Sequence, residues 1–220
     1  GMVSFTYTAS DGRGGFSSTT VQIDVNGTND APTLEVVSAA TVNEDGSKTI
    51  SFTAGDLDGT VSTAASANNG TVIVDENSGE ITYTPDANFN GSDTITVTTT
   101  DNNGASAVKT VSVTVNEVND APIDISFSGN SVTENAAGGT VVANLSASDV
   151  DAGETLSYQI TDDPSALFEV VGDQLLVKEG ADIDYESAET HQLTIQVTDG
   201  SGAVYSESVT INVADVNEVP

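Results

Sequence analysis

The feature that most limits how this chain can fold is a segment, Asn-Asp-Ala-Pro, that occurs at 29–32 and again at 119–122, with a weaker copy, Asn-Glu-Val-Pro, at 217–220. Each copy follows two strand-like segments joined by an Asp-containing turn. The turn aspartates and the asparagines are both spaced by 90 and then 98 residues: Asp11, Asp101, Asp199 and Asn29, Asn119, Asn217. A repeat of about 95 residues is too long for a solenoid and suits a β-sandwich.

Apolar and small polar residues alternate along most of each repeat, which is the periodicity of half-buried strands. Val3, Phe5 and Tyr7 show it before the first turn, and Val21 and Ile23 show it after the turn. We count about seven strands per full repeat and no helical periodicity. The sequence therefore predicts an all-β chain of tandem Ig-like antiparallel β-sandwiches, with the strands running up and down.

The repeat also predicts the domain boundaries. Two strands cannot form an independent domain, so residues 1–29 are interpreted as the C-terminal hairpin of a truncated preceding repeat. We expect residues 1–28 to pack against another molecule or to be displaced, as an artefact of the truncation and not as homophilic adhesion. Residues 30–119 and 120–220 are predicted to form one sandwich each. Aromatic residues in strand patterns are predicted to lie in the cores: Phe5, Tyr7, Phe52, Tyr158 and Phe168.

The charge of the chain narrows the choice of partners. There are 34 acidic and 4 basic residues, for a net charge of −30. Such a chain repels itself and is unsuited to nucleic acid, whereas hard divalent cations would neutralise it. There is no cysteine, so disulfides and metal sites with thiolate ligands are excluded. A metal ion bound by other ligands could stabilise the fold in place of disulfides. No segment has the length of a membrane span or the pattern of a signal peptide.

Five motifs of the third unit resemble cadherin repeats, and bacterial cadherin-like repeats of large surface adhesins in particular. They are Glu134-Asn135, Asp149-Val150-Asp151, Asp184-Tyr185-Glu186, Asp199-Gly200 and Asp215-Val216-Asn217-Glu218. The middle unit lacks the Asp-x-Glu motif; its Tyr83-Thr84-Pro85 and its segment 89–93 look like adhesin tandem repeats. The linkers depart from the cadherin pattern, because the second is one residue short and the first has Gly27 in place of the leading acid.

The resemblance implies Ca²⁺ sites at the joints between units, and the strand order is expected to gather acids at opposite poles of each sandwich. Calcium takes six to eight oxygen ligands, and residues two apart on extended backbone share a face. At the second joint we expect a site ahead of the linker, formed by Asn119, Asp149, Asp151 and Asp199. One or two ions behind it would use Glu44, Asp93, Glu117 and Asp120. The first joint would use Asn29, Asp56, Asp58 and Asp101, and the C-terminal end Glu134, Asp184, Glu186, Asp215 and Glu218.

The same residue types also occur in simpler roles. A single Asp-Gly is better explained by the preference of Asp and Gly for turns. Turns do not, however, require Asp-x-Asp, a distant Glu and Asn-Asp-x-Pro to recur in the same order. His191 is the only histidine and is interpreted as an ordinary strand residue, so no enzyme is predicted. The leading hypothesis is a calcium-binding, rod-forming segment of an adhesin on a bacterial cell surface, with neighbouring repeats as its partners. The alternative is an adhesion module that binds a glycan or another copy of itself.

Overall fold

The computed structural model describes residues 1–151 and 153–217, and every regular element in these ranges is a β-strand. The chain divides into two compact units, Gly1–Glu117 and Val118–Pro220. The first contains β1 (Met2–Ser10), β2 (Phe16–Asp24), β3 (Thr33–Val36), β4 (Ala39–Asn43), β5 (Lys48–Gly55), β6 (Val61–Ser66), β7 (Gly70–Asp75), β8 (Glu80–Pro85), β9 (Gly91–Asp101) and β10 (Ser106–Asn116). The second contains β11 (Asp124–Phe127), β12 (Ser131–Thr133), β13 (Val141–Ser148), β14 (Ser157–Asp162), β15 (Phe168–Val171), β16 (Gln174–Val177), β17 (Thr190–Thr198) and β18 (Val204–Ala214).

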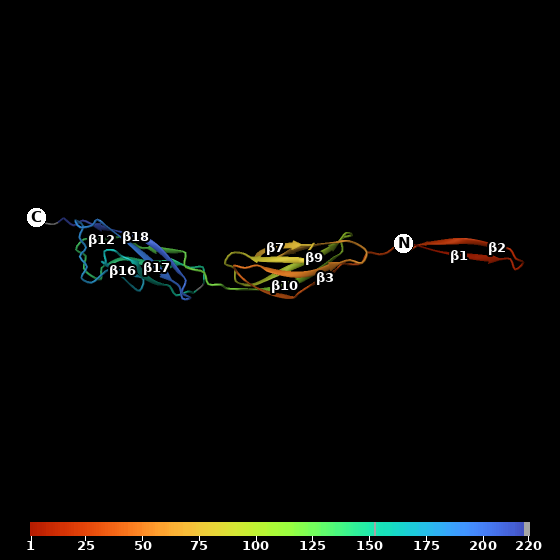
Figure 1. The fold of residues 1–220 in the computed structure, drawn as a ribbon, viewed down its shortest axis with the longest axis horizontal. Coiled ribbons are helices and arrows are strands. Elements are labelled where there is room, and N and C mark those ends of the chain that lie inside the picture. The colour runs from red at the N-terminus through yellow and green to blue at the C-terminus, as the bar shows by residue number, and fades with distance from the viewer. Residues whose placement is uncertain (152, 218–220) are drawn as a thin grey trace. The chain divides into compact units, whose positions relative to one another are not determined.

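Strands β3 to β10 form a sandwich of two four-stranded sheets, ordered β4-β10-β9-β6 and β3-β5-β8-β7 (Figure 1). The alternation seen in the sequence decides which side chains point inward, because successive residues of a strand face opposite sides of the sheet. In β9, Ile95 and Val97 are fully buried while the residue between them is less buried. The prediction of all-β, Ig-like sandwiches is confirmed.

The first strand of each sandwich is split between the two sheets. In the first unit β3 pairs antiparallel with β5, and β4 then pairs parallel with β10. The second unit repeats this arrangement, with β11 antiparallel to β13 and β12 parallel to β18. The prediction of a simple up-and-down antiparallel walk is wrong at this point. By changing sheets, one segment adds an outer strand to both sheets, which protects edges that would otherwise be open.

Each sandwich has its own hydrophobic core. The first consists of Leu34, Val42, Ile50, Phe52, Ile81, Tyr83, Ile95, Val97, Val111, Val113 and Val115. The second consists of Ile125, Val132, Val142, Ala143, Leu145, Phe168, Leu175, Val177, Ile183, Leu193, Ile195, Val197, Ile211 and Val213. Two separate cores are consistent with two sandwiches, although the repeat boundaries at 29/30 and 119/120 stay predictions.

Strands β1 and β2 form a two-stranded sheet of their own. Its register is that of the last hairpin in each sandwich, because Phe5 faces Val21 as Ile95 faces Val111. Ile95 is 0% exposed, whereas Phe5 is 51% and Tyr7 is 54% exposed. The prediction of a core position is therefore wrong for Phe5 and Tyr7. It is confirmed for Phe52 and Phe168, and Tyr158 packs against the second core while partly buried.

Among the described residues, no helix has the length and apolar character needed to cross a membrane.

Candidate metal centres

The turn aspartate of each repeat is held by its own turn. In the second unit Asp199 Oδ1 accepts hydrogen bonds from the backbone N–H groups of Ser201, Gly202 and Ala203, at 2.6 to 2.9 Å. Asp101 Oδ1 accepts from residues 103 and 105, and Asp11 Oδ1 from residues 13 and 15, in the same way. These bonds are the turn chemistry that explains an isolated Asp, and they use one carboxylate oxygen.

The other oxygen of this carboxylate faces the linker in both sandwiches. Asn119 Nδ2 donates to Asp199 Oδ2 at 2.9 Å, and Asn29 Nδ2 donates to Asp101 Oδ2 at 2.8 Å. The linker amides are the main cause of the lowered pKa of Asp199 and of Asp101, because a hydrogen bond to the carboxylate favours its charged form. Each aspartate thus stabilises its turn and fixes the linker asparagine.

In the second unit four predicted ligands meet at the pole where β13 and β17 end. The Asp120 N–H donates to Asp151 Oδ2 at 2.8 Å, and the Asp151 N–H donates to Asp149 Oδ1 at 3.0 Å. Asp151 and Asp199 are both almost completely buried. Asp149 Oδ2 is buried and has no hydrogen-bond partner. A buried carboxylate oxygen without a partner is costly unless a cation approaches it, so this set fits a hard cation.

The first unit has a similar set where β5 and β9 end. Asp56 Oδ2 is buried without a hydrogen-bond partner, as Asp149 Oδ2 is. Burial raises the pKa of Asp56, and the charges of the neighbouring Asp58 and Asp101 raise it further. Asn103 was not predicted as a site residue, yet its Nδ2 donates to Asn29 Oδ1. The second unit has Ser201 at the matching position, so the repeat pattern gave no signal for it.

The opposite pole of the second unit brings together Glu134, Glu186 and Asp215. One carboxylate oxygen from each lies within 4.8 Å of the others, and no other group of three acids among the described residues meets this condition. Glu134 is 3% exposed, and its carboxylate accepts hydrogen bonds from the N–H groups of Val216 and Tyr185. The bond from Val216 is the main cause of its lowered pKa. A compact cluster of carboxylates without a counter-charge is the kind of site that Ca²⁺ neutralises.

Asp184 was predicted to join this cluster, but the structure places it in the adjoining turn. Its Oδ1 accepts from the N–H groups of Glu186 and Ser187, and its Oδ2 accepts from Ser187 Oγ at 2.5 Å. Ser187 is the main cause of its lowered pKa. Glu218 lies outside the described residues.

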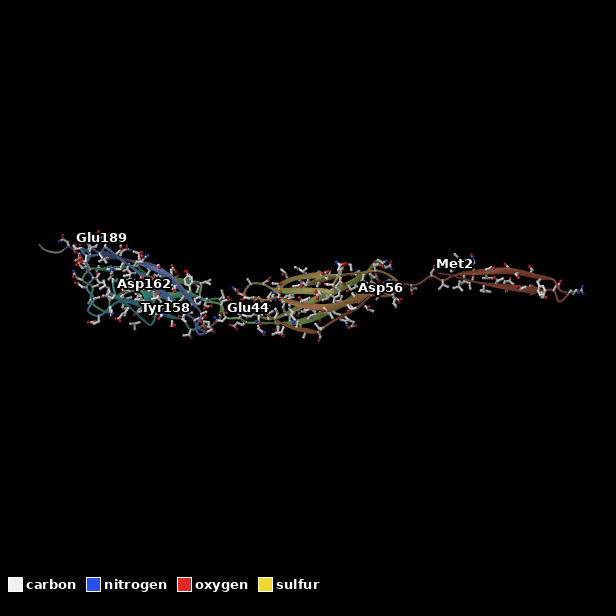
Figure 2. The ribbon with its side chains drawn as sticks, in the orientation of Figure 1. Met2, Glu44, Asp56, Tyr158, Asp162 and Glu189 are labelled. Carbon is white, nitrogen blue, oxygen red and sulfur yellow. The ribbon has the colours of Figure 1, made fainter. Side chains whose placement is uncertain are left out.

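At the matching pole of the first unit, the predicted ligands are not brought together in this way. Glu44 is buried where β4 ends, and Glu117 is exposed just after β10. Figure 2 shows Glu44 and Asp56 at opposite ends of this sandwich, as the strand order predicts. Asp93 points into the core, where its Oδ2 accepts from the Tyr83 hydroxyl at 2.9 Å and its Oδ1 from the Thr94 N–H at 2.7 Å.

The contact between Tyr83 and Asp93 was not predicted from the sequence. Two further backbone N–H groups, from residues 68 and 69, also reach Asp93, so both of its oxygens are used inside the sandwich. Burial raises the pKa of Tyr83, and its hydrogen bond to the charged Asp93 raises it further. Tyr83 and Asp93 are ten residues apart on different sheets, a separation that carries no sequence signal of contact. These contacts give Asp93 a structural role.

The only histidine, His191, lies in β17 with its ring 5.6 Å from that of Phe168 in an edge-to-face arrangement. Its Nε2 is buried and has no hydrogen-bond partner among the described residues, so this nitrogen is not paired with a nucleophile or an acid. Its surroundings are those of a strand residue at the margin of the core, as predicted.

Two family models match the chain, one over each sandwich. The model of the bacterial Ig domain matches residues 29–114, and the model of the cadherin domain matches residues 130–214. Domains of both kinds are typical of adhesion proteins, and they are typically extracellular and non-enzymatic. Cadherin domains usually bind Ca²⁺.

Among curated proteins, human Protocadherin beta-1 is 33% identical over 94 residues, which cover 40% of this chain and 12% of that protein. Human Cadherin-23 is 40% identical over 90 residues, which cover 40% of this chain and 3% of that protein. The chain therefore spans a small part of the curated relatives that it matches.

Solved structures show the same fold. A PcdhgB3 fragment with domains EC1-4 is similar with a TM-score of 0.62 and 25% identity, covering 98% of this chain and 58% of that one. Human Protocadherin-24 EC1-2 is similar with a TM-score of 0.58 and 18% identity, covering 86% of this chain and all of that one. The split first strand, the two cores and the family matches lead to one conclusion: the chain is a tandem of two sandwiches, of which the first matches the bacterial Ig domain over residues 29–114 and the second matches the cadherin domain over residues 130–214.

Proposed function

We propose that this chain is a calcium-binding, rod-forming segment of a bacterial cell-surface adhesin, and that calcium stiffens the linkers between its sandwiches. The proposal rests most directly on the contacts of the second linker. Asn119 and Asp120 are hydrogen-bonded to Asp199 and Asp151, next to the unpartnered buried oxygen of Asp149. A cation held by this set would tie the linker to the cadherin domain.

The charge of the chain supports the same proposal. Each sandwich carries acid clusters, while the whole chain has only 4 basic residues. Without a cation the clustered carboxylates repel each other, and the linker is held by hydrogen bonds alone. Extracellular calcium modules bind with a Kd of about 10⁻⁴ to 10⁻³ M, so these sites would be filled outside the cell and empty inside it.

Calorimetric titration tests calcium binding. We expect the chain to bind calcium, and both Asp149→Ala and Asp151→Ala to abolish the tightest binding event. Asp75→Ala is the matched control, because Asp75 also accepts turn hydrogen bonds, from residues 77 and 78, yet belongs to none of the three acid clusters described above. If the control lost as much binding as the two variants, the measured heat would not come from the proposed site.

Small-angle scattering tests the stiffening separately. We expect the largest dimension of the wild-type chain to increase, and its distribution of dimensions to narrow, when calcium replaces a chelator. Asp151→Ala should keep the chelator profile in both conditions. Calcium binding by calorimetry with unchanged scattering would overturn the stiffening role while leaving the site in place.

A further inference from the structure

Two loops supply the carboxylates that gather where β5 and β9 end in the first unit, and where β13 and β17 end in the second. One of them, the crossing loop, carries the Asp-x-Asp pair from one sheet to the other, between β5 and β6 or between β13 and β14. The other is the Asp-containing turn of the last hairpin. The crossing loop lies outside the paired strands, so a contact other than the strand ladder must hold its carboxylates near that of the turn.

In the second unit a side chain of the crossing loop reaches the turn. Glu154 lies three residues after Asp151, and its Oε2 accepts a hydrogen bond from the Gly200 N–H at 2.9 Å. Gly200 directly follows Asp199, the aspartate of the turn. This bond therefore joins the loop that carries Asp149 and Asp151 to the residue next to the third carboxylate of the site.

In the first unit the side chain comes from the turn instead. Asn102 directly follows Asp101, and its Oδ1 accepts a hydrogen bond from the Thr60 N–H of the crossing loop at 3.0 Å. The Asn102 N–H donates in return to the Thr60 carbonyl at 3.1 Å. Asn102 and Gly200 occupy the same place in their repeats, because each follows the turn aspartate. The two units thus join the same pair of loops by side chains that reach in opposite directions.

A glycine makes room for this side chain in both units. A Cβ added to Gly59 would clash with Asn102 Oδ1, and a Cβ added to Gly200 would lie 2.5 Å from Glu154 Oε2. Neither glycine has a positive φ, so the backbone conformation does not require glycine there. The close approach of the side chain does require it. Each unit therefore has both the side chain that reaches across and the space that admits it.

We propose that Glu154 and Asn102 are positioning residues of the two candidate calcium centres. Each holds the crossing loop against the turn, so that the carboxylates of both loops are gathered before a cation arrives. These carboxylates repel each other, and the bond opposes the resulting separation of the loops. The inference rests on the proposed calcium binding, and it adds two residues that act through their hydrogen bonds and not as calcium ligands.

Calorimetric titration of the full chain with calcium tests the second unit, and the binding event to follow is the one that Asp149→Ala abolishes. Loss of a contact that orients a metal ligand costs about 10–100-fold in affinity, so Glu154→Ala should raise the Kd of this event by that factor. Glu154→Gln keeps an acceptor oxygen and should restore most of the affinity. Gly200→Ala keeps every carboxylate but displaces the Glu154 side chain, so it should weaken binding as Glu154→Ala does.

Glu169→Ala is the matched control, because it removes one negative charge from the same unit but lies in β15. It should bind calcium as the wild type does. If Glu154→Gln bound as weakly as Glu154→Ala, Glu154 would act through its charge. If Gly200→Ala bound as tightly as the wild type, the hydrogen bond would not position the site. Either result overturns the proposal.

The first unit gives an independent test in which the change of charge has the opposite sign. Asn102→Ala removes the acceptor of the Thr60 N–H and should weaken the binding event that Asp56→Ala abolishes by about tenfold. Asn102→Asp keeps the acceptor and adds a negative charge, so its binding should be at least as tight as that of the wild type. Equal weakening by the two variants would contradict a role for the acceptor oxygen.

Amide hydrogen exchange in chelator reports the bond without calcium. The Gly200 N–H should exchange about tenfold faster in Glu154→Ala than in the wild type, and it should stay slow in Glu154→Gln. Equal exchange in the wild type and both variants would overturn the proposal at its first step. A wild-type chain with the expected exchange but no calcium binding would overturn the proposed function and the positioning role together. Calcium binding that is unchanged in Glu154→Ala would overturn the positioning role alone.

Discussion

The effect of Asp149→Asn on stability should change sign when calcium is added. Asparagine has the shape of aspartate and keeps Oδ1, which accepts the Asp151 N–H at 3.0 Å. It removes the negative charge on a carboxylate whose Oδ2 is buried without a partner beside other acids. Without calcium the substitution relieves repulsion, so the Tm of the cadherin domain should stay the same or rise. With calcium it removes a ligand, so the Tm should fall below that of the wild type.

The size of the calcium effect follows from ligand linkage. With a Kd of about 10⁻⁴ M, about 10 mM calcium stabilises a folded domain by about 2.7 kcal/mol per site. In a unit of roughly 100 residues each kcal/mol changes the Tm by about 4–8 °C, so the wild type should gain about 11–22 °C. A tenfold weaker site gives about 1.4 kcal/mol, so the variant should gain about half of that rise.

Differential scanning calorimetry in chelator and in calcium measures both effects. Asp162→Asn is the control, since Asp162 is an exposed aspartate at the end of β14 in the same unit and is predicted to be no ligand (Figure 2). Its calcium response should equal that of the wild type. If Asp149→Asn kept the full calcium response, or if it lowered the Tm equally in both conditions, the buried Oδ2 of Asp149 would not be a calcium ligand.

Three further predictions concern the sandwiches themselves. Tyr83→Phe should destabilise the first sandwich by about 1–2 kcal/mol in thermal unfolding, with and without calcium, because Asp93 loses one hydrogen bond. A loss of stability seen only with calcium would instead make Asp93 a calcium ligand. Hydrogen bonds lower the pKa of Asp101, Glu134 and Asp199, so they stabilise the fold fully above the ordinary carboxyl range of about pH 4 to 4.5. In chelator, the free energy of unfolding should therefore fall as the pH drops below this range. A midpoint for urea unfolding that is unchanged from pH 6 to pH 3 would contradict this. Ile95→Ala should lower the free energy of unfolding of the first sandwich by about 2–5 kcal/mol, as measured with urea. Phe5→Ala, at the matching position of the hairpin, should leave the stability of both sandwiches unchanged. Equal losses of stability from the two variants would mean that the hairpin packs on the first sandwich.

Much of the fold could be predicted because the same strand and turn pattern recurs at matching positions of each repeat. The spacing of Asp11, Asp101 and Asp199 predicted three hairpins, and the structure gives them the same register. The split of the first strand could not be predicted, because β3 and β4 show the same alternation and differ only in the sheet that they join. That choice is set by packing between distant strands, which local periodicity does not encode.

The candidate sites were predicted least well where an acid has several available partners. The sequence places Asp184 and Glu186 two residues apart, as a shared site requires, yet only Glu186 reaches the cluster with Glu134 and Asp215. Asp184 is held instead by Ser187, which lies within reach because the chain turns there. Asp93 similarly accepts bonds from Tyr83 and from nearby N–H groups. Competition of this kind depends on turn geometry and on contacts between sheets.

The parallel pairing of the first and last strands has a mechanical consequence. In the first sandwich β4 and β10 run in the same direction over five paired residues, from Ala39–Ser112 to Asn43–Asn116. A tensile load applied to the two ends of the domain pulls these strands past each other lengthwise. All of their hydrogen bonds then bear the load at once, instead of opening one after another as in a peeled hairpin. Forced unfolding of such a domain is therefore governed by the rate at which the whole strand pair ruptures.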